Sequence, residues 1–400
     1  SIMAAYKARL QEFDTLLAED VLDIKRLRNL CFGGIPDEGG RRPLCWRVLL
    51  HYLPLERRLW DDTLNKKRAQ YRHFIEEMVV EPARLSKNGE GNQHLQDHPL
   101  NPNPESQWGS FFKDNEVLAQ IDKDVRRLCP DMMFFQRATE YPCHVIVDDP
   151  EGERLTRRVT FGSLSASNVT RKGLGISMME PKRRSATTSD YMPLSPGSEA
   201  HWEVVERILF IYAKLNPGQS YVQGMNEIIG PIYYVYATDQ NLKYREHAEA
   251  DCFWSFISLM GEIRDLFIRT LDESESGIGQ WMDRLMRNLK NYDNHLWNRL
   301  NIQELRPQFF SFRWLTLMLS QEFDLPDVVR VWDSLFANSQ RFDFLIQVCT
   351  SMMVLQRDKI LEGDFAANMK LLQNYPPIDV QIIITKAVEL EETSPTPQAT

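Results

Sequence analysis

The chain has 400 residues, of which 43% are hydrophobic and 26% are charged, and its formal net charge at pH 7 is -9. These fractions are typical of a folded globular protein, and the length suffices for one large domain or two smaller ones. The negative charge disfavours non-specific nucleic-acid binding and a strong anchor on anionic membranes, because both need a cationic surface.

Cysteine and histidine usage indicates a reduced, intracellular protein. The six cysteines include no C-x-x-C pair, and most stand in apolar contexts where a thiol behaves as a small hydrophobe. The eight histidines lack the spacing of zinc ligands, so no metal site is predicted. We find no secretory signal and no apolar run near the ~18 residues that a membrane span needs. The sequence therefore predicts a cytoplasmic protein.

Apolar residues recur at helical spacing along nearly the whole chain, which predicts an all-α fold. The segment 143–147 is the exception, because its pattern favours a short strand or an extended conformation. Helices are predicted over residues 6–31, 42–52, 64–80, 116–128, 201–215, 251–271, 280–300, 309–319, 326–336, 342–361, 365–372 and 380–390.

Two segments have the composition of disordered chain. Residues 153–198 are rich in Ser, Thr, Arg and Lys, and we predict a flexible surface insertion there. Within it, Ser185 follows the basic run 182–184, which indicates either a phosphorylation site or a chance motif in a solvated linker. Residues 391–400 contain no core former and are predicted to be a disordered tail.

The first motif of chemical interest has the pattern I-x-x-D-x-x-R. It comprises Ile121, Asp124 and Arg127, near the end of a predicted helix. On a helix, Asp124 and Arg127 share a face, and Ile121 packs one turn earlier. Taken alone, this common spacing favours a solvated helix surface with a weak ion pair. Lys123 and Arg126 are predicted to be ordinary surface charges.

The second motif is Y-x-Q-G-M-N at residues 221–226, directly after the turn formed by residues 216–220. Taken alone, it predicts the start of a helix, with Tyr221 packed and Gln223 capping the helix. An arginine and a glutamine brought together can promote GTP hydrolysis, because the arginine neutralises charge on the transferring phosphate and the glutamine orients the attacking water.

Together, the two motifs resemble the paired signatures of the TBC domain, the catalytic domain of Rab GTPase-activating proteins. The resemblance extends upstream to Gly34-Ile35-Pro36 followed by Arg42 and Trp46, and downstream to the segments 312–314, 321–323 and 330–333. The segments 98–104, 246–251 and 361–365 further resemble one subgroup of the family. The chain departs from the family pattern at an extra pair, Gly39-Gly40, and at Arg41, where the family usually has Leu.

The resemblance implies a two-lobed, all-α TBC fold with a flexible insertion. It places a TBC domain at residues 34–390, after an N-terminal helical extension at residues 1–33. We assign Trp46, Trp314 and Trp332 to packing, because large aromatics at helical spacing usually lie in a core.

The resemblance also assigns roles to the motif residues. Arg127 is the arginine finger and Gln223 the glutamine finger, both supplied in trans to a Rab-family GTPase in its GTP-bound form. Asp124 orients Arg127, whereas Tyr221 and Asn226 support the loop or contact the GTPase. Arg42 is ambiguous between an ion pair at the edge of the core and a contact with the partner.

No cofactor of its own is expected, because the chain has no G-x-x-x-x-G-K-[ST] loop, and GTP and Mg²⁺ would come with the GTPase. The protein is then an activator that regulates vesicle traffic, not an independent enzyme. We expect a monomer that reaches membranes transiently, through the lipidated GTPase. One alternative is a catalytically silent TBC domain that binds a Rab as an effector or scaffold. Another is a helical interaction protein unrelated to GTPases.

Overall fold

The computed structural model describes residues 1–88, 107–149, 154–162, 191–267 and 277–393. Within these ranges every named secondary-structure element is a helix, which confirms the predicted all-α class. The chain forms two compact units, in keeping with the two-lobed fold that the resemblance implies. The first unit holds both ends of the described chain, and the second holds its middle.

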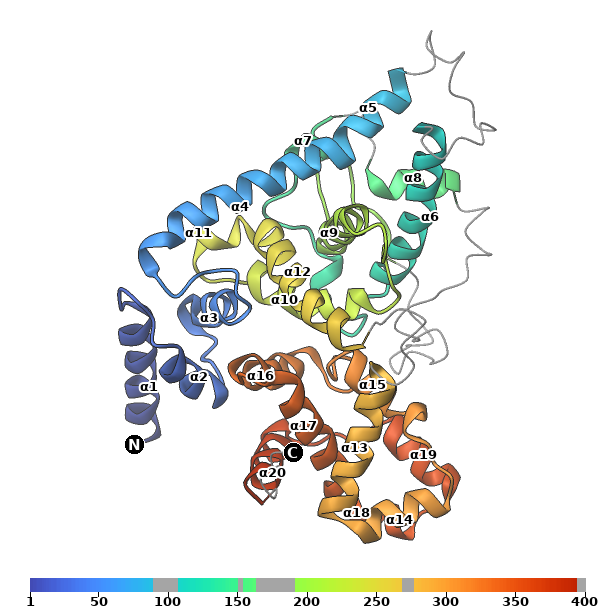
Figure 1. The fold of residues 1–400 in the computed structure, drawn as a ribbon. Helices are drawn as coiled ribbons and strands as arrows, with labels where there is room; N and C mark the ends of the chain where they lie inside the picture. The colour runs from blue at the N-terminus through green and yellow to red at the C-terminus, as the bar shows by residue number, and fades with distance from the viewer. Residues whose placement is uncertain (89–106, 150–153, 163–190, 268–276, 394–400) are drawn as a thin grey trace. The chain divides into compact units, whose positions relative to one another are not determined.

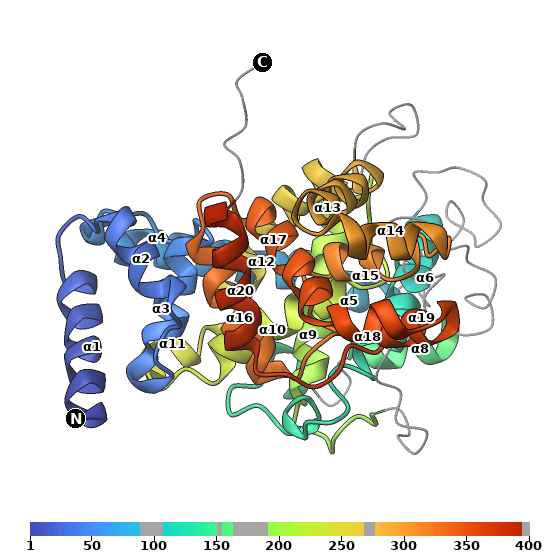
Figure 2. The ribbon, with the colours of Figure 1, turned by 90° about the horizontal axis from the view of Figure 1, so that it is seen from below.

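The first unit comprises Ser1–Trp60 and the described residues from Ser258 onward, so the predicted extension 1–33 is helical and lies within it. In Figure 2, α16, α17 and α20 lie side by side, and α2 packs against α16. The helices of this unit are α1 (Ile2–Leu17), α2 (Ile24–Phe32), α3 (Arg41–Leu49), α13 (Ile278–Tyr292), α14 (Asn294–Ile302), α15 (Ser311–Thr316), α16 (Leu325–Ala337), α17 (Arg341–Leu355), α18 (Arg357–Glu362), α19 (Phe365–Gln373) and α20 (Val380–Thr393).

Aromatic side chains form the centre of this unit. The Trp46 ring meets Phe336 edge-to-face, with ring centroids 4.9 Å apart, and lies 6.2 Å from Trp332. Trp46, Trp314 and Trp332 are all fully buried, which confirms their assignment to packing.

The departures from the family pattern are accommodated locally. Gly39 and Gly40 both have a φ of 72°, a left-handed conformation that costs glycine little. They lead into α3, where Arg41 donates two hydrogen bonds of 2.9 Å to Asp14 of α1. Arg41 therefore ties the first helix of the chain to the third.

The second unit is built around α9, in which every residue from His201 to Ala213 is buried. The helices α6, α8 and α10 pack against it, and Figure 1 shows α9 nearly end-on among them. A π-helical turn, Glu76–Val80, links α4 to α5 in one continuous rod. The helices of this unit are α4 (Trp60–Ile75), α5 (Glu81–Asn88), α6 (Gln107–Val125), α7 (His144–Val147), α8 (Leu155–Gly162), α9 (His201–Leu215), α10 (Met225–Ala237), α11 (Leu242–Arg245) and the first half of α12 (Ala248–Phe267).

Several helix boundaries differ from the prediction, and capping explains some of the differences. The predicted helix 201–215 is confirmed at both ends, whereas the predicted helix 280–300 is two helices. Asp293 separates them, because its side chain accepts a hydrogen bond of 3.0 Å from the Leu296 N–H and so begins a new helix. The prediction of a strand at 143–147 is wrong: the segment forms the one-turn helix α7, since a short apolar run fits either state.

The prediction of a disordered insertion at residues 153–198 is wrong at its start. Arg154 is buried there and pairs with Glu203 of α9 at 3.1 Å. Arg158 of α8 lies 4.4 Å above the Phe111 ring and donates to Asn115 at 3.1 Å. Arginine can pack its long stem in a core when its guanidinium has partners, so a charged segment need not be mobile.

The prediction is also wrong at the end of the insertion, where Tyr191 is 6% exposed. The residues between, 163–190, lie outside the described residues, and so does the proposed phosphorylation site at Ser185. Because α20 continues to Thr393, the predicted tail is helical at its start, and residues 394–400 are not described.

Candidate functional site

The arginine of the first motif lies just beyond a helix rather than on it. Helix α6 ends at Val125, and the Arg127 N–H donates to the Asp124 carbonyl at 3.2 Å in a closing turn. The Arg127 Nε donates to the Lys123 carbonyl at 3.1 Å, and the side chain remains 30% exposed. The ion pair with Asp124 is present but long, with Nη2 3.9 Å from Oδ1.

Asp124 makes its shorter contacts with the second motif. The Tyr221 hydroxyl donates to Asp124 Oδ2 at 2.6 Å, across 97 positions of sequence. The Asn226 side-chain amide donates to the Asp124 backbone carbonyl at 3.4 Å. All three residues are 6% exposed, so they form one buried polar cluster in which the carboxylate strengthens its hydrogen bond. The structure thus brings the two motif segments together.

Gln223 stands in the tight loop between α9 and α10. Ser220 has a φ of 55°, and its N–H donates to the Asn216 carbonyl at 2.6 Å. Gly224 has a φ of 103°, a backbone conformation that strains residues with a Cβ, and it precedes the first residue of α10. Gln223 is half-buried between buried neighbours, and the N-cap of α10 is Gly224 and not Gln223.

Arg42 belongs to the first unit, whereas this cluster belongs to the second. Its guanidinium donates to Asp333 at 3.0–3.2 Å and also binds the Ile35 carbonyl and Asp37. The Arg42 side chain is 11% exposed and Asp333 is fully buried. Of the two roles left open for Arg42, these contacts favour the ion pair at the edge of the core over a partner contact.

A largely buried ion pair next to Arg127 is not evident from the sequence. Arg126 was predicted to be a surface charge, but its side chain is 15% exposed, pairs with Asp122 at 2.6 Å and lies 4.8 Å from the Trp202 ring. Burial, and then the neighbouring Asp122 carboxylate, raise the pKa of the Glu206 carboxyl well above its usual value. The i,i+4 spacing of Asp122 and Arg126 is visible in the sequence, but their burial is not.

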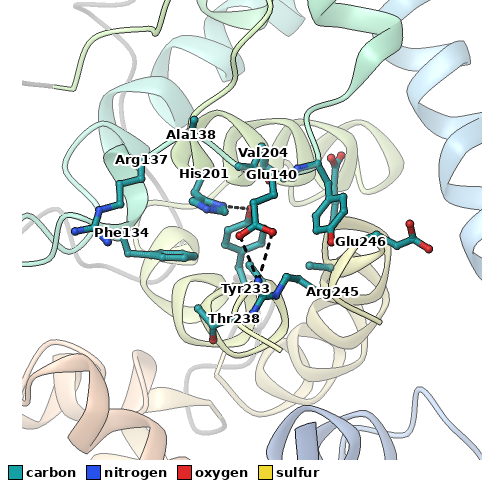
Figure 3. Close-up of a pocket in the computed structure, with 15 residues that line it drawn as sticks. Phe134, Arg137, Ala138, Glu140, His201, Val204, Tyr233, Thr238, Arg245 and Glu246 are labelled. Atoms are coloured by element: carbon teal, nitrogen blue, oxygen red, sulfur yellow. Dashed lines mark hydrogen bonds and ion pairs between the residues drawn. The ribbon is translucent and has the colours of Figure 1, made fainter. Parts of the chain in front are cut away.

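A separate pocket opens in the second unit (Figure 3). The His201 ring stacks on Phe134 with centroids 4.2 Å apart, and its Nδ1 lies 2.6 Å from the Tyr233 hydroxyl. Across the pocket, Arg245 pairs with Glu140 at 3.3 Å. None of the six residues assigned above from the family resemblance lines this pocket, so it is distinct from the motif cluster.

Two kinds of site are absent from the part of the chain that the structure describes. No helix there is both long and apolar enough to cross a membrane. Nor does that part contain a group of three or more His, Cys, Asp or Glu side chains that could hold a metal ion.

Comparison with known proteins now defines the class. Residues 191–361 match the Rab-GTPase-TBC domain family. A TBC domain-containing protein of Schizosaccharomyces pombe is 34% identical over 96% of this chain and 73% of that protein. The chain therefore belongs to the TBC-domain family of Rab GTPase-activating proteins.

Within the family, similarity is high to one group of relatives. TBC1 domain family member 13 of Mus musculus is 54% identical over 97% of this chain and 99% of that protein, and the Homo sapiens protein of the same name is also 54% identical. This agreement confirms the subgroup predicted from the segments 98–104, 246–251 and 361–365. The crystal structure of the Ypt/Rab-GAP domain of Gyp1p matches the fold with a TM-score of 0.64 at 20% identity, covering 97% of this chain and 99% of that chain.

Proposed function

We propose that this protein accelerates GTP hydrolysis by a Rab-family GTPase, with Arg127 and Gln223 supplied in trans as the catalytic residues. The observation that carries the proposal is the 2.6 Å hydrogen bond from Tyr221 to Asp124, because it joins the two segments that bear those residues. Membership of the TBC family supports a Rab as the partner.

Arg127 would stabilise the charge that develops on the transferring phosphate. Its Nε is held by the Lys123 carbonyl, which directs the stem along α6, and its exposure allows contact with a partner. A planar guanidinium can bridge two phosphate oxygens at once, whereas an ammonium cannot. An arginine finger of this kind accelerates hydrolysis roughly 10³–10⁵-fold, or lowers the barrier by ~4–7 kcal/mol.

Gln223 would hold the attacking water in line with the phosphate. A short loop fixed by two left-handed residues, Ser220 and Gly224, suits this role because it limits the motion of the side chain between them. Asp124, Tyr221 and Asn226 would hold in place the two backbone segments that carry Arg127 and Gln223. GTP and Mg²⁺ would arrive with the GTPase, so the activator needs no cofactor of its own.

The protein would act as a monomer on the GTP-bound form of its partner, in the cytoplasm. It would reach membranes transiently, through the lipid anchor of the Rab, and so regulate vesicle traffic.

Single-turnover GTP hydrolysis by a panel of purified Rab proteins, with and without this protein, tests the proposal. We expect a strong acceleration for one or a few Rabs, and loss of most of it in both Arg127→Ala and Gln223→Ala. Arg137→Ala and Gln240→Ala, which remove exposed residues of the same types from the same unit, should keep the parent rate.

The alternative, a silent TBC domain that binds a Rab as an effector or scaffold, predicts a different result. Some GTP-bound Rabs would then bind without any acceleration of hydrolysis, and neither Arg127→Ala nor Gln223→Ala would change a rate. That outcome would replace the proposed activity with a binding function.

A further inference from the structure

One residue holds the chain on both sides of Arg127. The Tyr191 N–H donates to the Arg126 carbonyl at 3.2 Å, and the Tyr191 hydroxyl donates to the Leu128 carbonyl at 2.9 Å. In return, Arg126 Nη1 donates to the Tyr191 carbonyl at 2.7 Å. Tyr191 is 6% exposed and lies 63 positions from Leu128 in the sequence, so this is a buried tertiary contact.

These hydrogen bonds lie in the turn directly after the end of α6. The last carbonyls of a helix have no partner within the helix, so the chain after it is ordered only where other groups supply donors. Here α6 ends at Val125, and the chain then turns sharply, with a φ of 43° at Cys129. Tyr191 supplies donors to residues 126 and 128, which leaves Arg127 between two fixed points.

The side chain of Arg126 fastens the same contact from the other direction. It spans Asp122 on α6 at 2.6 Å and the Tyr191 carbonyl at 2.7 Å, above the Trp202 ring of α9. Charge-assisted hydrogen bonds of this length are strong and directional. Tyr191 is thereby tied to the body of the second unit as well as to the Arg127 turn.

We propose that Tyr191 is a positioning residue for Arg127, which acts by fixing the backbone of residues 126–128 and so the direction from which the guanidinium leaves the protein surface. This inference rests on the proposed function, in which Arg127 is the arginine finger. Small errors in the placement of a reacting group cost large factors in rate, so a group that sets this backbone affects catalysis without touching the GTPase.

The hydroxyl is available as a donor throughout the neutral range. Burial raises the pKa of Tyr191 to about 12. The phenol therefore remains protonated at any pH used for a GTPase assay, and its effect should not depend on pH between 6 and 9.

Tyr191→Phe tests the proposal, because it removes the donor to Leu128 and leaves the ring in place. We expect kcat for activated GTP hydrolysis to fall about three- to tenfold, the factor that corresponds to the loss of one buried hydrogen bond. The KM for the GTP-bound GTPase should stay at the parent value, since the substrate-binding surface is unchanged.

Tyr375→Phe is the matched control. Tyr375 lies in the first unit, is 4% exposed, and its hydroxyl donates to the Met352 carbonyl at 2.7 Å. The Tyr375→Phe variant therefore loses a tyrosine-to-carbonyl bond of the same kind, in the unit that does not contain Arg127. We expect a similar loss of thermal stability in both variants, but a fall in kcat in Tyr191→Phe alone.

Arg127→Ala, assayed beside them, separates this inference from the proposed function. If Arg127→Ala keeps the parent rate, the proposed function fails, and the role of Tyr191 fails with it. If Arg127→Ala loses most of the rate while Tyr191→Phe keeps the parent kcat, raises only KM, or falls no further than Tyr375→Phe, the positioning role is overturned and the proposed function stands.

Discussion

At the scale of single residues, Asp333 decides the role of Arg42. Its buried carboxylate accepts hydrogen bonds from the Trp46 indole at 2.8 Å and the Ile35 N–H at 2.9 Å, in addition to those from Arg42. Burial raises the pKa of the Asp333 carboxyl, and the Arg42 guanidinium opposes that shift. The arginine is thus the charge that permits a carboxylate in this core.

Arg42→Ala should therefore act on stability rather than on activity. Removing one partner of a buried ion pair leaves an uncompensated charge, so we expect the free energy of unfolding to fall by about 3–5 kcal/mol. At a temperature where the variant is folded, kcat and KM for the GTPase should match the parent. Urea unfolding, followed by tryptophan fluorescence, measures the first quantity, and a hydrolysis assay measures the second.

The neighbouring arginine offers a control for this prediction. Arg41 pairs with Asp14, whose side chain is 53% exposed. Exposed pairs contribute about 0.2–1 kcal/mol, so Arg41→Ala should change stability little. A raised KM in Arg42→Ala with unchanged stability would instead assign Arg42 to the partner-binding surface.

At the scale of elements, the important junction lies between the end of α6 and the loop before α10. The Tyr221–Asp124 bond closes it. Tyr221→Phe removes the donor of this bond and Asp124→Ala removes its acceptor, so the two variants interrupt one interaction from opposite sides. We expect each to lower kcat about 10- to 150-fold, since a hydrogen bond to a carboxylate contributes about 1.5–3 kcal/mol. The double variant should be no worse than the more damaging single variant, because both remove the same contact.

Tyr236→Phe controls for the loss of a buried hydroxyl in the same unit. The Tyr236 hydroxyl bonds to Ser255 at 2.8 Å, joining α10 to α12 rather than to α6. We expect its kcat to remain at the parent value. If the losses of kcat in the Tyr221 and Asp124 variants were additive, the two residues would act separately. That result would contradict the claim that one hydrogen bond joins the two segments.

The sequence predicts the parts of this fold in which local pattern and burial agree. Helix α9 is apolar at helical spacing and bounded by Pro and Gly, and its predicted ends are those observed. The two motifs were recognisable for the same reason, as short segments of fixed spacing. The segment that contains α8 is not recognisable as a helix from the sequence. Arg154 and Arg158 have the composition of a solvated loop, and only their partners on other elements allow them to be buried.

The Tyr191 contact lies beyond what one sequence can indicate. Nothing local distinguishes a tyrosine at the end of a polar stretch from a loop residue, and its partners lie 63 and 65 positions away. The same holds for Arg126, which follows Asp122, Lys123 and Asp124 in the sequence and so has the charged context of a surface position. Tertiary pairing of charged side chains leaves no periodic trace of the kind that apolar burial leaves.

At the scale of the whole molecule, buried ionisable groups make stability depend on pH in opposing directions. Burial and Asp122 raise the pKa of Glu206, so its contribution to stability is present below the unfolded value and is lost as the pH rises. His201 behaves in the opposite way. It lies at the N-terminus of α9, where the helix dipole also disfavours a cation, and burial lowers its pKa to about 4.

The consequence is a loss of stability in mild acid that His201→Gln should reduce. A histidine whose folded pKa is depressed contributes stability that is present above the unfolded value of 6.5 and is lost as the pH falls toward about 4. At 1.36 kcal/mol per pH unit, this interval corresponds to an upper limit of roughly 3 kcal/mol.

Denaturant unfolding of the parent and of His201→Gln at pH 7, 5.5 and 4.5 measures this loss of stability. Between pH 7 and 4.5 the parent should lose more stability than His201→Gln, which cannot take up the proton. Parallel losses across that range would mean that other groups, and not the buried ring between Phe134 and Tyr233, govern the acid response.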